Sequence, residues 1–286
     1  MSFGVIVGIL TLLFTFSGIG IAILLRWKNK FTLTIKILEI ILGIFGLIYF
    51  IIFRYTQDII NLINYQNSTS DISIYYSKVL LLDMCPFMYV FLNLCFIFDY
   101  KNKLIKVVSL WSIIGSSITI IGSIWSANDD GDPWKYIFID SQEGALYYFI
   151  HGYMLIFGTF FYVYNNRLNF VNVLGAHVLA GTYLIYVLII VKTLNITQNA
   201  TGLVEYDWIN VNGEYHQVYE MFNMGYPDIM FLSYFLVWLE MVVLIILRNS
   251  FAKPTLQWFW PKIIYKKINF WNVYSKKWYE FRLKTI

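Results

Sequence analysis

Seven apolar stretches of about 20 residues constrain this chain more than any other feature. A helix rises about 1.5 Å per residue, so each stretch is long enough to cross the roughly 30 Å hydrocarbon core of a bilayer. The stretches are Gly4–Leu25, Ile37–Phe53, Val79–Phe98, Val107–Ala127, Gly144–Tyr164, Phe170–Val191 and Ile229–Leu247. The sequence therefore predicts an all-α fold, a polytopic membrane helix bundle with about seven transmembrane helices.

The composition points to the bilayer as the solvent for most of the chain. Of the 286 residues, 59% are hydrophobic and only 13% are charged, whereas a soluble domain carries about 25% charged residues. A soluble core of this length does not bury so much apolar surface. We expect a transmembrane domain over residues 1–247, with a long outer loop at 192–228, and a tail at 248–286.

The distribution of positive charge predicts the orientation. All but four of the 21 Lys and Arg residues lie in segments that share one side if the N-terminus is outside; the four are Arg54, Lys78, Lys135 and Lys192. Cytoplasmic loops of membrane proteins are enriched in Lys and Arg. The prediction is a multi-pass protein of the cell membrane, N-terminus out and C-terminus in.

The tail from Arg248 interleaves lysines with tryptophans. Amphipathic rings and ammonium groups both favour the headgroup zone, so this pattern predicts binding to anionic lipids of the inner leaflet. A solvated basic tail is the alternative. No nucleic-acid-binding pattern accompanies the basic residues, and the sequence does not indicate an oligomeric state.

Polar groups inside membrane spans are costly and are therefore candidates for function. Cys85 follows Asp83 in the third stretch, and His151 lies in the fifth. Counted along ideal helices, the thiol and the imidazole lie about 9–10 Å below the same outer face. A thiol beside a base is the arrangement that nucleophilic acyl transfer requires. Asp83 is expected to orient a partner on a neighbouring helix, and Pro86 to kink the third helix.

Each of these residues also has a structural interpretation. A buried Cys is commonly an inert small hydrophobe, and a membrane His commonly bonds a neighbouring helix. Cys95 and His177 are expected to be structural, Glu39 to pair with Lys36, and Glu240 to bond a Tyr or Ser or to serve as an ion site. The sequence lacks the motifs of phosphate-binding loops, zinc proteases and serine hydrolases, and we expect neither a cofactor nor a metal.

Two segments resemble a known family. The stretch LLLDMCPFMYVFLNLCFIF, which contains Asp83 and Cys85, resembles the third-helix signature of the YwaF family of bacterial integral membrane proteins. The stretch YYFIHGYMLIFGTFFYVY resembles the helix of that family with a His-Gly pair. That family is related to a eukaryotic transmembrane acyltransferase that remodels ether phospholipids. The resemblance implies that Cys85 is a nucleophile and His151 a base; where the family has a His two residues before the Cys, this chain has Asp83.

Three functions remain open from the sequence. The first is a membrane acyltransferase or lipid hydrolase that acts on membrane phospholipids through Cys85 and His151. The second is a transporter or solute-binding subunit, with Asp83, His151 and Glu240 along a path. The third is a non-catalytic assembly protein that acts through its loops and tail.

Overall fold

The computed structural model describes residues 3–27, 33–65, 72–126, 132–141, 144–164, 168–197, 199, 201–211, 213 and 215–251. The predicted lipid-binding tail lies outside these residues, apart from its first few positions. The described part is almost entirely helical, as the sequence predicts. Its elements are α1 (Phe3–Trp27), α2 (Leu33–Phe50), η1 (Ile51–Tyr55), α3 (Thr56–Asn64), α4 (Ile72–Val79), α5 (Met84–Phe98), α6 (Ile105–Ser126), α7 (Pro133–Phe138), β1 (Asp140–Ser141), β2 (Gly144–Ala145), α8 (Tyr147–Tyr164), α9 (Phe170–Leu194), α10 (Tyr206–Ile209), α11 (His216–Phe222) and α12 (Asp228–Phe251).

Within the described residues, five helical segments are long and apolar enough to cross a membrane. They are Val5–Leu25, Ile35–Asn64, Ile72–Phe98, Phe170–Leu194 and Asp228–Arg248. Five of the seven expected spans are thereby matched. The other two expected spans correspond to α6, whose shorter apolar part is Ile105–Ile120, and to α8, of 18 residues. Both are helices at the expected places; the count of seven spans stays a prediction.

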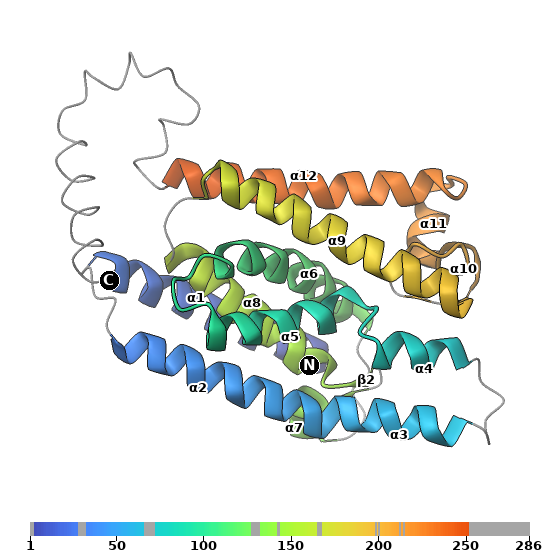
Figure 1. Cartoon of the computed structure of the whole chain (residues 1–286), viewed down its shortest axis with the longest axis horizontal. Coiled ribbons are helices and arrows are strands. Elements are labelled where there is room, and N and C mark those ends of the chain that lie inside the picture. The colour runs from blue at the N-terminus through green and yellow to red at the C-terminus, as the bar shows by residue number, and fades with distance from the viewer. Residues whose placement is uncertain are drawn as a thin grey trace, which may run out of the picture.

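The helices form one bundle with α6 and α8 at its centre. Figure 1 shows α2 and α3 along one side of the bundle and α9 and α12 along the opposite side, with α1, α5, α6 and α8 between them. Helices α10 and α11 lie in the connection between α9 and α12, at the same end of the bundle as α3 and α4. We call this the loop end.

Helix α2 reaches the loop end through a π-helical turn. In η1 the backbone N–H of Thr56 donates to the Ile51 carbonyl, five residues earlier, and the Thr56 hydroxyl donates to the same oxygen at 2.7 Å. A π turn inserts one extra residue and thereby rotates the next helix, α3, about its axis. Arg54 lies in this turn and Asp58 one turn later, so their side chains share one helix face.

The third expected span is interrupted. Helix α4 ends at Val79 and α5 begins at Met84, with Leu81 in the left-handed region at φ 53°. The sequence analysis placed the irregularity at Pro86, and that prediction is wrong. Pro86 lies in the first turn of α5, where a backbone N–H would have no acceptor within the helix, so its absence does not disturb the helix. The unwound Leu80 and Leu82 carbonyls accept hydrogen bonds from the Tyr186 and Tyr183 hydroxyls, both at 2.6 Å.

Buried polar groups join α2, α5 and α8 in the middle of the bundle. Asn93 is fully buried; its amide donates to the Tyr89 carbonyl at 2.8 Å and its oxygen accepts from the Tyr153 hydroxyl at 2.8 Å. The Tyr89 hydroxyl in turn donates to the Gly46 carbonyl. Such satisfied networks specify one helix arrangement, because any other would leave polar groups unpaired in an apolar environment.

The end of the bundle opposite the loop end has its own ion pair. Lys36 and Glu39 are both buried, with Nζ 2.6 Å from Oε2. Lys36 also donates to Asn102 and to the Asp99 carbonyl. The predicted Lys36–Glu39 pair is confirmed, and it ties α2 to the connection between α5 and α6.

Candidate functional site

Cys85 occupies the first turn of α5 and is partly exposed. Its thiol lies 3.8 Å from the Gly115 carbonyl of α6, to which it donates a hydrogen bond. A Cβ on Gly115 would lie 3.4 Å from the Cys85 sulfur, at the limit of ordinary van der Waals contact, so the thiol packs directly against this position. The interruption before α5 therefore places the thiol at a helix N-terminus rather than deep within a continuous helix.

His151 lies near the start of α8 and is buried, with 4% of its surface exposed. Its Nδ1 is 2.6 Å from the carbonyl of Tyr147, one turn earlier. A ring nitrogen that faces a carbonyl must carry the proton, so in the neutral ring Nε2 is the basic nitrogen. This is the tautomer that a general base requires.

The periodicity of α8 predicts that His151 points toward α6, the helix that Cys85 contacts. Gly158 follows His151 by two turns of α8, so the two residues share a face. A Cβ on Gly158 would lie 3.0 Å from the Ser112 Cβ of α6. Helix periodicity therefore directs His151 toward α6, about one helical turn nearer the loop end than the contact of Gly115 with Cys85.

Asp83 is not the group that orients the imidazole. Its carboxylate is 2.6 Å from the Lys78 Nζ and 3.4 Å from the Ser77 hydroxyl. Asp83 was expected to orient a partner on a neighbouring helix, but the group that faces the His151 ring nitrogen is the Tyr147 carbonyl. The bonds described above join the three candidate residues to different partners, and a direct Cys85–His151 pair stays a prediction.

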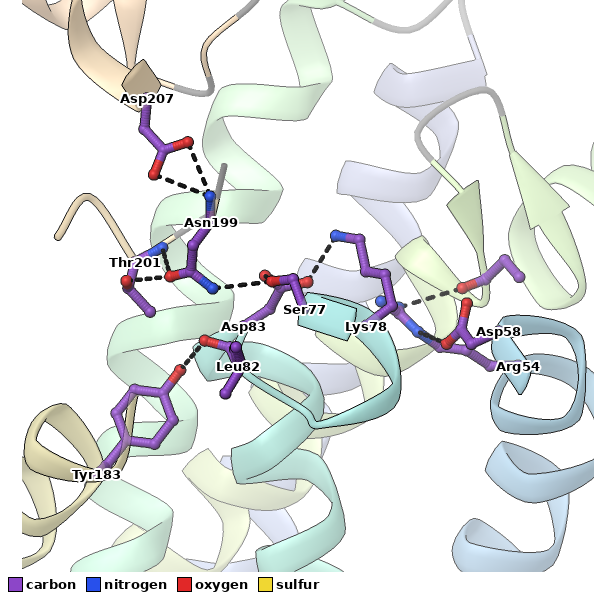
Figure 2. A network of polar contacts seen from close by, with 11 residues as sticks. Arg54, Asp58, Ser77, Lys78, Leu82, Asp83, Tyr183, Asn199, Thr201 and Asp207 are labelled. Carbon is purple, nitrogen blue, oxygen red and sulfur yellow. Dashed lines mark hydrogen bonds and ion pairs between the residues drawn. The ribbon is translucent and has the colours of Figure 1, made fainter. Parts of the chain in front are cut away.

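A network of charged and polar groups surrounds Asp83 at the loop end (Figure 2). Arg54 and Asp58 pair at 3.6 Å, and an Arg54 nitrogen donates to the Ala145 carbonyl of β2 at 3.3 Å. Two of the four basic residues expected on the outer side, Arg54 and Lys78, are thus neutralised by nearby carboxylates. In the sequence, these pairs are visible as opposite charges four residues apart (Arg54 and Asp58) and five residues apart (Lys78 and Asp83). The sequence analysis did not predict either pair.

The connection between α9 and α12 reaches into this network. Asn199 donates through its side chain to the Ser77 hydroxyl at 2.8 Å and through its backbone to both oxygens of Asp207, at 3.0 and 3.2 Å (Figure 2). Asn199 and Asp207 are buried, with 1% and 0% of their surface exposed. Sequence reasoning did not find Ser77 or Asn199, because their contact spans 122 residues.

The loop around Asp207 is packed rather than extended. The Trp208 ring nitrogen donates to the Gly202 carbonyl at 2.8 Å, and its ring stacks on Tyr215 at 4.8 Å. Burial, with Glu205 and Asp207 nearby, raises the pKa of the Tyr226 phenol, which donates to the Leu203 carbonyl at 3.1 Å. The loop thus has a defined fold that presents Asn199 to α4.

The remaining sequence candidates have structural partners. Glu240 of α12 accepts from the Ser117 hydroxyl of α6 at 3.3 Å, in agreement with the expected bond to a Tyr or Ser. Nε2 of His177 accepts from the Trp238 ring nitrogen at 3.1 Å, which joins α9 to α12. Cys95 is buried in the apolar core. Within the described ranges, no group of three His, Cys, Asp or Glu side chains is arranged to hold a metal ion.

Within the described residues, the fold and the site together define an almost entirely helical protein of the membrane type, with five segments long and apolar enough to cross a membrane and a network of paired charges at one end of its bundle. The model of a family of unknown function, DUF5378, matches residues 5–282. The chain belongs to this family.

Two relatives come from mycoplasmas. The uncharacterized protein MG135 of Mycoplasma genitalium is 29% identical over 168 residues, which cover 58% of this chain and 59% of the relative. Its homolog from Mycoplasma pneumoniae is 27% identical over 179 residues, which cover 60% of this chain and 62% of the relative. The chain thus matches less than two thirds of the length of either relative. No solved structure matches it. The resemblance to the YwaF family stays a prediction.

Proposed function

We propose that this membrane protein transfers or hydrolyses acyl groups of membrane phospholipids, with Cys85 as the nucleophile and His151 as the general base. One inference carries the proposal: helix periodicity directs the imidazole of α8 toward α6, the helix that the thiol of α5 contacts in its half nearer the loop end. The thiol contacts Gly115 there, and the Tyr147 carbonyl holds His151 in the tautomer whose Nε2 accepts a proton.

The chemistry would take the covalent route of thiol enzymes. The Cys85 thiol turns from the Gly115 carbonyl and gives its proton to Nε2 of His151. The thiolate adds to the ester carbonyl of a lipid, and the resulting intermediate expels the lipid alcohol, which takes the proton back from His151. The acyl group then rests on Cys85 as a thioester. Water releases it as a fatty acid, or the hydroxyl of a second lipid accepts it.

The thioester provides the test. The full-length protein is reconstituted in phosphatidylcholine vesicles that contain a lipid with a fluorescent acyl chain, and labelled protein is detected after denaturation. We expect a label that hydroxylamine removes, present in the parent and in Cys95→Ala and absent from Cys85→Ala. Released fatty acid would indicate hydrolysis, and a newly acylated lysolipid would indicate transfer. A label of equal strength on Cys85→Ala would contradict the proposal.

A second function is supported by the charges within the spans. Two ion pairs and one further acid lie within segments long and apolar enough to cross the membrane: Arg54 with Asp58, Lys78 with Asp83, and Glu240. Ionisable groups in such segments commonly mark the path of a solute or ion. The polar network of Figure 2 supports a path for a solute or ion past Asp83. If no thioester forms and Asp83→Asn instead changes ion flux into sealed vesicles, transport is the better assignment.

We also propose seven spans, with the loop end outside the cell membrane and the basic tail at its inner leaflet. The small number of Lys and Arg residues at the loop end supports this orientation. A reporter fused after Arg248 should be cytoplasmic, and one inserted near Asn199 should be external. Protease protection of the two fusions in intact cells measures this. An external reporter after Arg248 would overturn the orientation and, with it, the contact of the tail with anionic lipids.

A further inference from the structure

Asp83 is the N-cap residue of α5, but its side chain does not cap the helix. The backbone of Asp83 is extended, at φ −81° and ψ 134°, as is usual at an N-cap. An N-cap carboxylate normally accepts from the N–H groups of the second or third helical residue. Here the side chain makes no such bond. It accepts from Lys78 and Ser77 instead (Figure 2).

The partners of Asp83 are themselves fixed. Ser77 is buried, with 3% of its surface exposed, and its hydroxyl also accepts from the Asn199 side chain at 2.8 Å. Asn199 is held in turn by Asp207 of the loop between α9 and α12. The position of the Asp83 carboxylate is therefore set by α4 and by this loop rather than by α5.

The orientation of this carboxylate matters for Cys85, the second residue of α5. The N-terminus of a helix is its positive end, and it favours a thiolate nearby. A carboxylate that capped the same turn would place a negative charge beside the sulfur and oppose that effect. Lys78 compensates the charge of Asp83, and Ser77 helps to keep the carboxylate turned away.

We propose that Ser77 and Lys78 are positioning residues that hold the Asp83 carboxylate off the first turn of α5 and thereby keep the Cys85 thiol reactive. The proposal rests on the proposed function for its biological meaning, since it concerns the same thiol. The reactivity of the thiol, however, is measured without any lipid substrate, so the two proposals fail separately.

The test is the rate at which a small neutral maleimide alkylates the full-length protein in micelles of an alkyl maltoside, a detergent without acyl esters, at neutral pH. All variants carry Cys95→Ala, so that Cys85 is the only thiol that reports. We expect Ser77→Ala to slow alkylation roughly twofold to fivefold, the effect of one charge at a helix terminus. Lys78→Met leaves Asp83 uncompensated and should slow it roughly tenfold. Ser77→Thr and Lys78→Arg should react at close to the parent rate.

Variants of Asp83 separate positioning from a general loss of structure. Asp83→Asn has no negative charge to place beside the sulfur, so it should react at least as fast as the parent. The double variant Ser77→Ala with Asp83→Asn should recover the parent rate. Slow alkylation in that double variant, or an unchanged rate in both Ser77→Ala and Lys78→Met, would overturn the proposal. If these rates behave as expected but no thioester forms in the lipid assay, the positioning stands and the acyl-transfer function fails.

Discussion

His151→Ala is expected to slow thioester formation at Cys85 by a factor of roughly 10² to 10⁴, the usual contribution of a general base. The imidazole is the only group in the proposed mechanism that takes the thiol proton. Its ring is already oriented by the Tyr147 carbonyl, with the basic nitrogen directed away from its own backbone. The rate is measured as the appearance of hydroxylamine-sensitive label in vesicles that contain the fluorescent lipid.

His177→Ala is the matched control. His177 also places Nδ1 against the carbonyl four residues earlier, at 2.8 Å from Val173, but it lies on α9 and bonds Trp238. Its loss should leave the label almost unchanged. Equal rates for His151→Ala and the parent would remove His151 from the mechanism, and a similar loss in both variants would indicate damage to the bundle instead.

The second large effect is expected from the contact between α2 and α5. A Cβ on Gly43 would lie 2.7 Å from the Asn93 carbonyl and 2.9 Å from the Phe96 Cβ. The carbonyl belongs to the backbone of α5, so it yields only if the two helices separate. We expect Gly43→Val to lower the free energy of unfolding by about 2–3 kcal/mol, as overpacking does in other cores, measured by thermal unfolding in detergent.

Gly181→Val is the control for this change. Gly181 lies in α9, and a Cβ there would meet nothing within 4 Å. Both substitutions introduce the same β-branched side chain into a long helix, so the intrinsic cost is shared. If the two variants unfold at the same temperature, close packing at Gly43 does not stabilise the bundle.

The helices were predictable because their signal is local. A run of about 20 apolar residues is visible without any knowledge of its neighbours, and the pairing of Lys36 with Glu39 is expected from their spacing within one helix. The interruption before α5 was placed wrongly. Leu81 adopts a left-handed conformation that leucine seldom takes, and no turn-forming residue type marks the position.

The candidate site was predictable only in part, because most of its contacts are distant in the sequence. The equal depth of Cys85 and His151 was inferred by counting residues along ideal helices, and it stays a prediction. The pairing of Asp83 with Lys78 was not predicted, although the two residues are close in the chain. The break between α4 and α5 brings them together. Nothing local indicates that Asn199 contacts Ser77.

The paired charges of Figure 2 also bear on how the chain enters the membrane. If the loop end is outside, Arg54 and Lys78 must be carried across the bilayer during synthesis. Each of these cations has its carboxylate partner within five residues, Asp58 and Asp83 respectively. A cation that is translocated together with its counter-ion costs less than one that crosses alone. The same pairs that organise the loop end would therefore lower the barrier to insertion, and two outward positive charges need not oppose the topology.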